Sequence, residues 1–129
     1  MASDPFPVLG ELELAALEHL WELGEDDVAG AHAAIGRARA ITLNTVGSAL
    51  ERLHRKGLVR RWKVSHAYRY AAIMERESFH ARRMLDAVGG AQALADTGLL
   101  AAFVDAVAEV DEGSLERLAQ ILDARRGDK

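Results

Sequence analysis

The stretch Thr42-Leu-Asn-Thr-Val-Gly-Ser-Ala-Leu-Glu-Arg-Leu-His-Arg-Lys-Gly57 predicts an amphipathic helix with two contrasting faces. Apolar residues recur at i, i+3, i+4 and i+7, the spacing of one buried helix face: Val46, Ala49, Leu50 and Leu53. Polar side chains occupy the other side: Asn44, Thr45, Ser48, Arg52 and Arg55. Short hydrogen-bonding groups and guanidinium groups suit base edges and phosphates in a DNA major groove. An ordinary solvated helix has the same pattern, so the flanking sequence must decide between the two interpretations.

The residues after Gly57 favour the DNA interpretation. Residues 58–63 and 67–72 are rich in β-branched and aromatic residues and are separated by a short gap, which predicts a β-hairpin. From Thr42 to Tyr70 there are seven Lys or Arg residues against one acid, Glu51, although the whole chain has a net charge of −4. Positive charge concentrated on a helix and an adjacent hairpin is the electrostatic pattern expected of a duplex-binding surface.

Two further helices are predicted before the polar helix. Residues 11–23 form the first, which ends at Gly24, and an acidic turn at residues 25–27 caps the second, at residues 28–37. Thr42 is a suitable N-cap for the third helix. Three helices followed by a hairpin are typical of a winged helix-turn-helix domain, in which the third helix enters the groove.

The remaining residues predict a helical region that cannot bury its own apolar stripes. Short helices are marginal in water, and a symmetric partner would complete their core. We therefore predict a mainly α fold with a small β-hairpin wing: a winged helix-turn-helix DNA-binding domain at 1–74 and a dimerisation region at 75–129. We expect residues 1–74 alone to be folded and monomeric. The predicted dimer contacts are Phe79, Leu85, Val88, Leu99, Leu100, Phe103, Val104, Val107, Leu118, Ile121 and Leu122. Folding of this region back onto the first domain is the alternative.

Composition excludes several classes of protein. The chain has no cysteine, so disulfides and thiolate metal sites are excluded. No apolar run approaches the ~20 residues that a membrane-spanning helix needs. No basic segment that would begin a signal peptide is present at the N-terminus, so we expect a cytoplasmic protein without membrane insertion. The glycines do not form a phosphate-binding pattern, and no nucleophile–base arrangement is evident. We expect neither an enzyme nor a cofactor or metal.

Several segments of the chain resemble the penicillinase-repressor (BlaI/MecI) family of bacterial transcriptional regulators. The recognition-helix match is the most specific, and the similarity extends over most of the chain. The matching segments are residues 9–13 and 19–22, 28–35, 42–59, 67–70 and 103–122.

The resemblance implies a homodimer that binds a palindromic DNA operator and represses β-lactam resistance or stress genes. Positions that match family DNA contacts are Thr42, Asn44, Thr45, Ser48 and Arg52. A membrane sensor protease commonly relieves repression in this family, acting indirectly through cleavage of the C-terminal helices, and the matching bond here is Ala102–Phe103. The copper-sensing branch uses C-terminal cysteine pairs, which this chain lacks, so thiolate copper sensing is excluded. The expected wing glycine is also missing from residues 64–66.

Four further basic side chains complete the predicted DNA-binding set: Arg55, Arg61, Lys63 and His66. Arg61 and Lys63 alternate with neighbours along a predicted strand, so only one side of that strand can face DNA. Two other functions remain open on the residues alone. The basic face could dock an acidic protein partner, or the protein could be a regulator that senses a small ligand.

Overall fold

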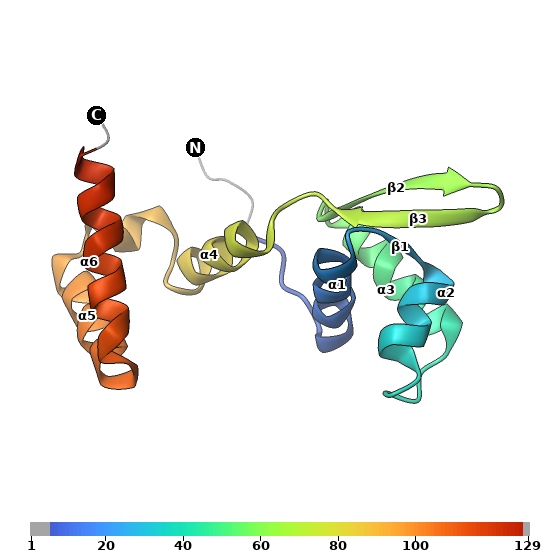
Figure 1. Cartoon of the computed structure of the whole chain (residues 1–129), viewed down its shortest axis with the longest axis horizontal. Coiled ribbons are helices and arrows are strands. Elements are labelled where there is room, and N and C mark those ends of the chain that lie inside the picture. Colours follow the sequence, from blue (N-terminus) through green and yellow to red (C-terminus); the bar gives the residue numbers. More distant parts are fainter. Residues whose placement is uncertain (1–5, 128–129) are drawn as a thin grey trace. The chain divides into compact units, whose positions relative to one another are not determined.

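The structure, a computed structural model, describes residues 6–127, which are mainly helical with one small sheet (Figure 1). The chain forms two compact units with a boundary between Met84 and Leu85. The elements of the N-terminal unit are α1 (Glu11–Leu23), β1 (Asp26–Asp27), α2 (Val28–Ala31), the π-helical turn η1 (His32–Gly36), α3 (Leu43–Arg55), β2 (Val59–Val64) and β3 (Ala67–Ala72). Helix α4 (Arg76–Ala87) crosses the boundary, and the C-terminal unit continues with η2 (Ala91–Ala95), α5 (Thr97–Val110) and α6 (Glu112–Gly127).

Helix α3 forms where its cap and its periodicity predict it. The Thr42 hydroxyl accepts a hydrogen bond from the Thr45 backbone N–H at 3.2 Å, which satisfies a free donor of the first turn. All four residues of the apolar stripe are buried: Val46, Ala49, Leu50 and Leu53. Just beyond the helix, Gly57 adopts a φ of 77°, a left-handed conformation that glycine accepts without strain. The predicted recognition helix is confirmed as a structural element.

The sheet has three antiparallel strands, in the order β1-β3-β2. The hairpin pairs Val59 with Ala72 and Val64 with Ala67, so only two residues make the turn. The first of these, Ser65, has a φ of 56°, so a non-glycine residue takes the left-handed conformation that the tight turn needs. The hairpin forms as predicted although the glycine is missing.

The predicted acidic turn at residues 25–27 is corrected in part. Asp26 pairs with Tyr70, which makes β1 a third strand of the sheet. Arg69 of β3 balances the negative charge at this sheet edge: its Nη1 atom lies 3.9 Å from Asp27 Oδ2, and its Nε atom donates to Glu25, just before the strand, at 3.2 Å. The Asp27 carboxylate nevertheless accepts from the Gly30 backbone N–H at 2.8 Å, so the expected cap of α2 is present.

Phe79 belongs to the core of the N-terminal unit, which corrects its predicted place at a dimer interface. Its side chain is 0% exposed, and its ring centroid lies 5.2 Å from that of Phe6 and 5.3 Å from that of Trp21. The Trp21 indole N–H donates to the Met74 carbonyl at 2.8 Å, which ties α1 to the chain just before α4. The first part of α4 therefore completes the winged-helix core, and the division of the chain falls ten residues after the predicted one.

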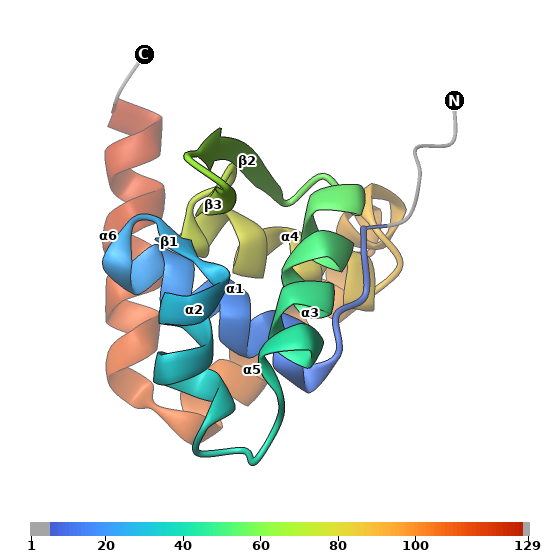
Figure 2. The same cartoon turned by 90° about the vertical axis from the view of Figure 1, so that its right-hand side faces the viewer.

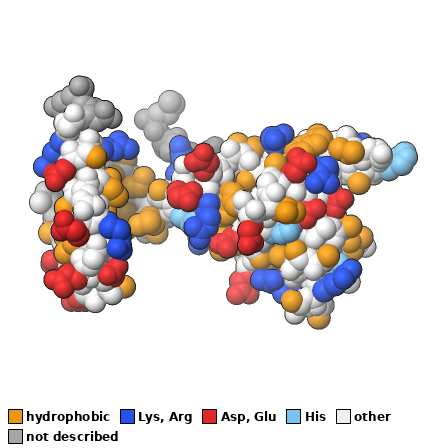
Figure 3. Space-filling model, viewed as in Figure 1, with side chains coloured by type: hydrophobic (Ala, Val, Ile, Leu, Met, Phe, Trp, Pro, Cys, Tyr) orange, Lys and Arg blue, Asp and Glu red, His pale blue; other side chains and the backbone are white. Residues whose placement is uncertain are grey.

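In the C-terminal unit, α5 and α6 lie side by side and are joined through Asp111 (Figure 1). Asp111 accepts hydrogen bonds from the Ser114 hydroxyl at 2.8 Å and from Arg117 at 2.7 Å, and these bonds lower the pKa of its carboxyl below the usual range. No described residue of this unit is buried. Hydrophobic side chains are accordingly visible on its surface (Figure 3). Within residues 6–127, no helix has the length and apolar character to cross a membrane.

Candidate nucleic-acid interface

The polar face of α3 is continuous and exposed. Figure 2 shows α3 at the surface of its unit, together with the turn that leads into it from α2. Asn44, Thr45 and Ser48 are exposed along the first half of the helix, and Arg55 is exposed at its end. The hydroxyl groups of Thr42 and Thr45 are 3.0 Å apart and hydrogen-bonded. Arg52 lies between these groups along the chain, with 42% of its side chain exposed.

The turn before α3 carries two arginines that the sequence did not assign to the DNA-binding set. Arg37 and Arg39 are exposed, and Arg39 donates to the Ile35 carbonyl at 3.0 Å. The backbone N–H of Ile41 donates to the Gly36 carbonyl at 3.1 Å and closes the turn. In the sequence, the sign that could have identified them is that both lie within five residues of the predicted N-cap, Thr42. They extend the basic surface past the N-terminal end of the helix.

The wing divides its basic residues between its two faces. Arg61 donates to the Glu51 carboxylate of α3, and its guanidinium carbon lies 4.4 Å from the centroid of the Tyr68 ring. Lys63 lies on the same face, with its Nζ atom 5.7 Å from that ring, and remains exposed. Arg61 was expected to reach DNA, but its charge is already paired within the protein. Its observed contacts join the wing to α3.

The other face and the tip of the wing are more open. The guanidinium carbon of Arg60 lies 4.6 Å from the centroid of the Trp62 ring, a cation–π contact on the face opposite Arg61. His66 is exposed in the turn between β2 and β3. The pairing of Arg61 with Glu51 therefore leaves Lys63 and His66 as the exposed members of the predicted wing set.

One buried carboxylate contacts the end of α3, and sequence reasoning did not single it out. Glu13 of α1 is 7% exposed, and among the residues that the structure describes it is the one buried charged side chain. Lys56 donates to its Oε2 atom at 2.6 Å, and the Gly10 backbone N–H donates to its Oε1 atom at 3.2 Å. Arg52 Nε lies 3.9 Å from Oε1. The Glu13 carboxylate therefore contacts two cations from the C-terminal end of α3.

The pKa of Glu13 reflects opposing effects. Burial raises it, because desolvation disfavours the charged form. The hydrogen bonds from Lys56 and Gly10 and the charges of Lys56 and Arg52 outweigh burial, so the pKa lies below its usual value of 4.5. Because its pKa is depressed, ionised Glu13 stabilises the fold at every pH above the pKa that it has in the unfolded chain. This stabilisation is lost as the pH falls through the pKa of Glu13 in the folded protein. Glu13 is thus ionised at neutral pH.

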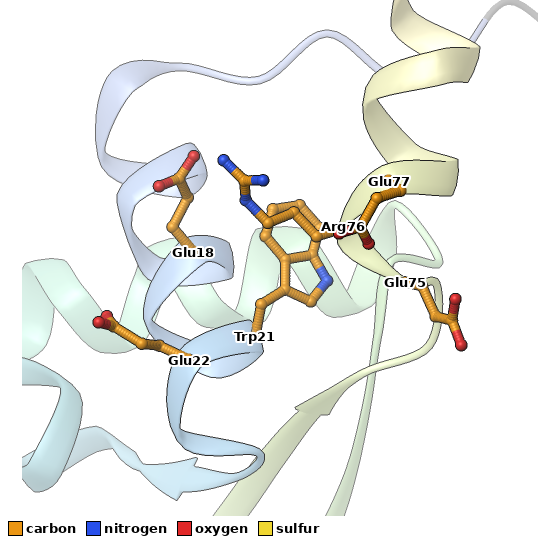
Figure 4. Close-up of a pocket in the computed structure, with 6 residues that line it drawn as sticks. All are labelled: Glu18, Trp21, Glu22, Glu75, Arg76 and Glu77. Atoms are coloured by element: carbon orange, nitrogen blue, oxygen red, sulfur yellow. The ribbon is translucent and has the colours of Figure 1, made fainter. Parts of the chain in front are cut away.

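An acidic pocket marks a surface that phosphate would avoid. Its volume is about 550 Å³, and it lies between α1 and the start of α4 (Figure 4). The Arg76 guanidinium points toward Glu18 in this view. Four glutamates and one arginine line the pocket, so its net charge is negative and disfavours DNA. The lining residues are Glu18, Trp21, Glu22, Glu75, Arg76 and Glu77.

The histidines that lie near apolar stripes make contacts within the fold. His19 lies 2.7 Å from Asp26, and the His32 ring nitrogen lies 2.9 Å from the Ile41 carbonyl. Within residues 6–127, no group of three or more His, Asp or Glu side chains is placed to hold a metal ion.

Comparison with known proteins agrees with this geometry. The family model described as penicillinase repressor matches residues 9–124. Two curated relatives, each called transcriptional regulator BlaI, come from Mycobacterium tuberculosis strains CDC 1551 / Oshkosh and ATCC 25618 / H37Rv. Each is 33% identical over 126 residues, which cover 94% of this chain and 89% of the relative.

Two solved structures match the chain at low sequence identity and with TM-scores below 0.5. The crystal structure of transcriptional regulator PA4135 has a TM-score of 0.43 and 19% identity, and covers 94% of this chain and 79% of that one. The structure of disulfide-formed AbfR has a TM-score of 0.46 and 18% identity, with 87% and 73% covered. The family-model match over most of the chain and the identity to the BlaI regulators are decisive: this protein belongs to the penicillinase repressor family, and it is a DNA-binding transcriptional repressor and not an enzyme.

Proposed function

We propose that this repressor binds a palindromic operator as a homodimer, with one α3 in the major groove of each half-site. The observation that carries this proposal is the uncovered apolar surface of the C-terminal unit. Leu99, Leu100, Phe103 and Val104 are 36–46% exposed, although they form the apolar stripe of α5. A second copy would cover this stripe through a two-fold interface. Two half-sites separated by about one helical turn, ~34 Å, would then match the two-fold axis.

The contacts along DNA follow from the exposure of each side chain. Asn44, Thr45, Ser48 and Arg52 are assigned to base edges, because they lie along the exposed face of α3. Other exposed groups flank that face and are assigned to the phosphate backbone: Arg37, Thr42, Arg55, Lys63 and His66. Arg61 is assigned to positioning the wing, because its guanidinium is paired with Glu51 of α3.

Arg52→Ala is expected to weaken operator binding by about 1–3 kcal/mol, the range for an arginine that reads a base. Binding to random duplex should change much less, because phosphate contacts carry no sequence information. A band-shift titration of both DNAs at one salt concentration measures the difference. Arg76→Ala is the matched control, since it removes an exposed arginine that lines the acidic pocket of the same unit. An unchanged operator affinity for Arg52→Ala would contradict the assignment.

We also propose that repression of β-lactam resistance or stress genes is relieved by cleavage at Ala102–Phe103, triggered by a membrane sensor protease. The bond lies inside α5, and both residues are exposed. Proteases act on extended chain, so α5 must open locally before this bond can be cut. Cleavage would separate Phe103, Val104 and all of α6 from the DNA-binding unit.

Exposure of producing cells to a β-lactam is expected to yield a fragment that ends at Ala102. Intact-mass spectrometry of the recovered chain detects this product. Full-length protein that persists while the target genes are transcribed would refute relief by cleavage, and the operator-binding proposal would remain.

A further inference from the structure

We infer that the buried carboxylate of Glu13 is a specificity-determining positioning residue: it withholds Lys56 from DNA and orients Arg52 on the reading face. This inference rests on the DNA-binding role proposed for α3. Glu13 itself contacts no DNA, because it lies on α1 with its carboxylate buried against the end of α3. Its effect passes through the two cations that it contacts.

Lys56 is held on two sides by acceptors from the N-terminal part of the chain. Its Nζ atom donates to Glu13 Oε2 at 2.6 Å and to the Val8 carbonyl at 2.9 Å. To reach a phosphate, Lys56 would have to leave both acceptors and strand a buried, unpaired carboxylate, which is strongly unfavourable. Arg55, its neighbour in the sequence, is exposed and has no such restraint. Lys56 therefore lies within the basic stretch without being available to DNA.

Arg52 is oriented rather than withheld. Its Nε atom lies 3.9 Å from Glu13 Oε1, which is an electrostatic contact beyond hydrogen-bonding distance. The guanidinium has five N–H donors in a rigid plane, and its contact with Glu13 is made through Nε, on the side of that plane. Its two terminal nitrogens thus remain for a bidentate contact with a base, while the carboxylate limits the rotation of the plane.

Glu13 also lowers the positive charge of this corner of the DNA-binding face. Lys56, Arg52 and Glu13 together carry one net positive charge, and the two cations would carry two without the acid. Each additional cation available to phosphate strengthens binding to every DNA sequence and steepens its dependence on salt. Contacts with base edges, which distinguish one DNA sequence from another, are not strengthened by that extra charge. A buried acid at this position therefore lowers the affinity for DNA in general and increases the preference for the operator over other sequences.

Glu13→Gln in the full-length protein tests the inference, because the amide keeps the shape of the side chain and removes its charge. Operator, selected from random-sequence DNA, and a random duplex are titrated across a series of KCl concentrations. For the random duplex, we expect the slope of log K against log salt to steepen by about 0.9 for each cation released. Affinity for the random duplex should rise several-fold at low salt, and the operator-to-random ratio should fall.

Three variants isolate the effect. Glu18→Gln removes an exposed acid from the same helix and is expected to leave the slope unchanged. Lys56→Gln in the wild-type background should also leave the slope unchanged, whereas in the Glu13→Gln background it should reverse the steepening. Lys63→Ala removes an exposed lysine of the wing and should reduce the slope, which calibrates the measurement.

Two results would overturn the inference. One is a Glu13→Gln protein with a lower melting temperature but the slope and operator-to-random ratio of the wild type, which would make Glu13 only a structural residue. The other is a reduced slope for Lys56→Gln alone, which would make Lys56 a phosphate contact and decides the question even if Glu13→Gln does not fold. Neither result affects the proposed function, which fails separately if the wild type shows no sequence preference.

Discussion

Replacement of Phe103 by Asp is expected to dissociate the repressor into monomers and to weaken operator binding by roughly a hundredfold or more. Phe103 is an exposed aromatic residue within the apolar stripe that contains Leu99, Leu100 and Val104. An unpaired carboxylate buried at an apolar interface costs several kcal/mol, and large aromatic residues near the interface centre carry much of the binding energy. A monomer also loses the effective concentration that couples two half-sites, which is worth about 10²–10⁴ in affinity.

Sedimentation equilibrium measures the oligomeric state, and band-shift titration with intact and half-site operators measures the coupling. Val110→Asp is the matched control, because Val110 lies at the end of the same helix and is 88% exposed. That variant should remain dimeric. A dimeric Phe103→Asp protein would show that α5 is not the interface, whereas a wild-type monomer at operator-binding concentrations would remove the homodimer from the proposal.

Replacement of Phe79 by Ala is expected to lower the free energy of unfolding of the N-terminal unit by about 3–5 kcal/mol. The Phe79 ring is fully buried and packs against the rings of Phe6 and Trp21, so its removal leaves a cavity between α1 and α4. Urea denaturation of a fragment of residues 1–84, followed through tryptophan fluorescence, measures the change. Phe79→Leu should cost less, because it keeps most of the buried apolar volume.

Burial of Phe79 also determines where the DNA-binding unit ends. A fragment of residues 1–74 lacks Phe79, so we now expect it to be much less stable than the fragment of residues 1–84, contrary to the expectation from the sequence. Equal stability of the two fragments, or a loss below about 1 kcal/mol for Phe79→Ala, would place Phe79 outside the core. A variant with normal stability but weaker dimerisation would restore the original assignment to the dimer interface.

Elements with strong local signals were predictable. The bounds of α1 match the prediction, because the apolar periodicity and Gly24 mark its length. The Thr42 cap and the stripe of α3 are equally local, since a cap spans three residues and a stripe repeats every three or four. The short strand β1 was missed for the opposite reason: only its pairing with β3, more than forty positions away in the sequence, makes it a strand.

The candidate site also has features that local sequence predicts and features that depend on distant residues. The sequence shows which side chains of α3 share a polar face, and that face is exposed as predicted. It does not show which cations are already neutralised. Arg61 and Lys56 are chemically as suitable for phosphate as Lys63, yet Glu51 and Glu13 pair with the first two. Partners from distant parts of the chain set these differences, and no local pattern encodes them.

The sequence by itself determined the family, the order of three helices and a wing, and the polar face of the recognition helix, because periodicity, caps and turns act between near neighbours. Only the tertiary structure decided that α4 begins inside the DNA-binding unit, that Arg61 joins the wing to α3, and that Glu13 contacts Lys56 and Arg52. Burial of Phe79 and pairing of charges both depend on which surfaces meet, and that is settled when the helices pack together.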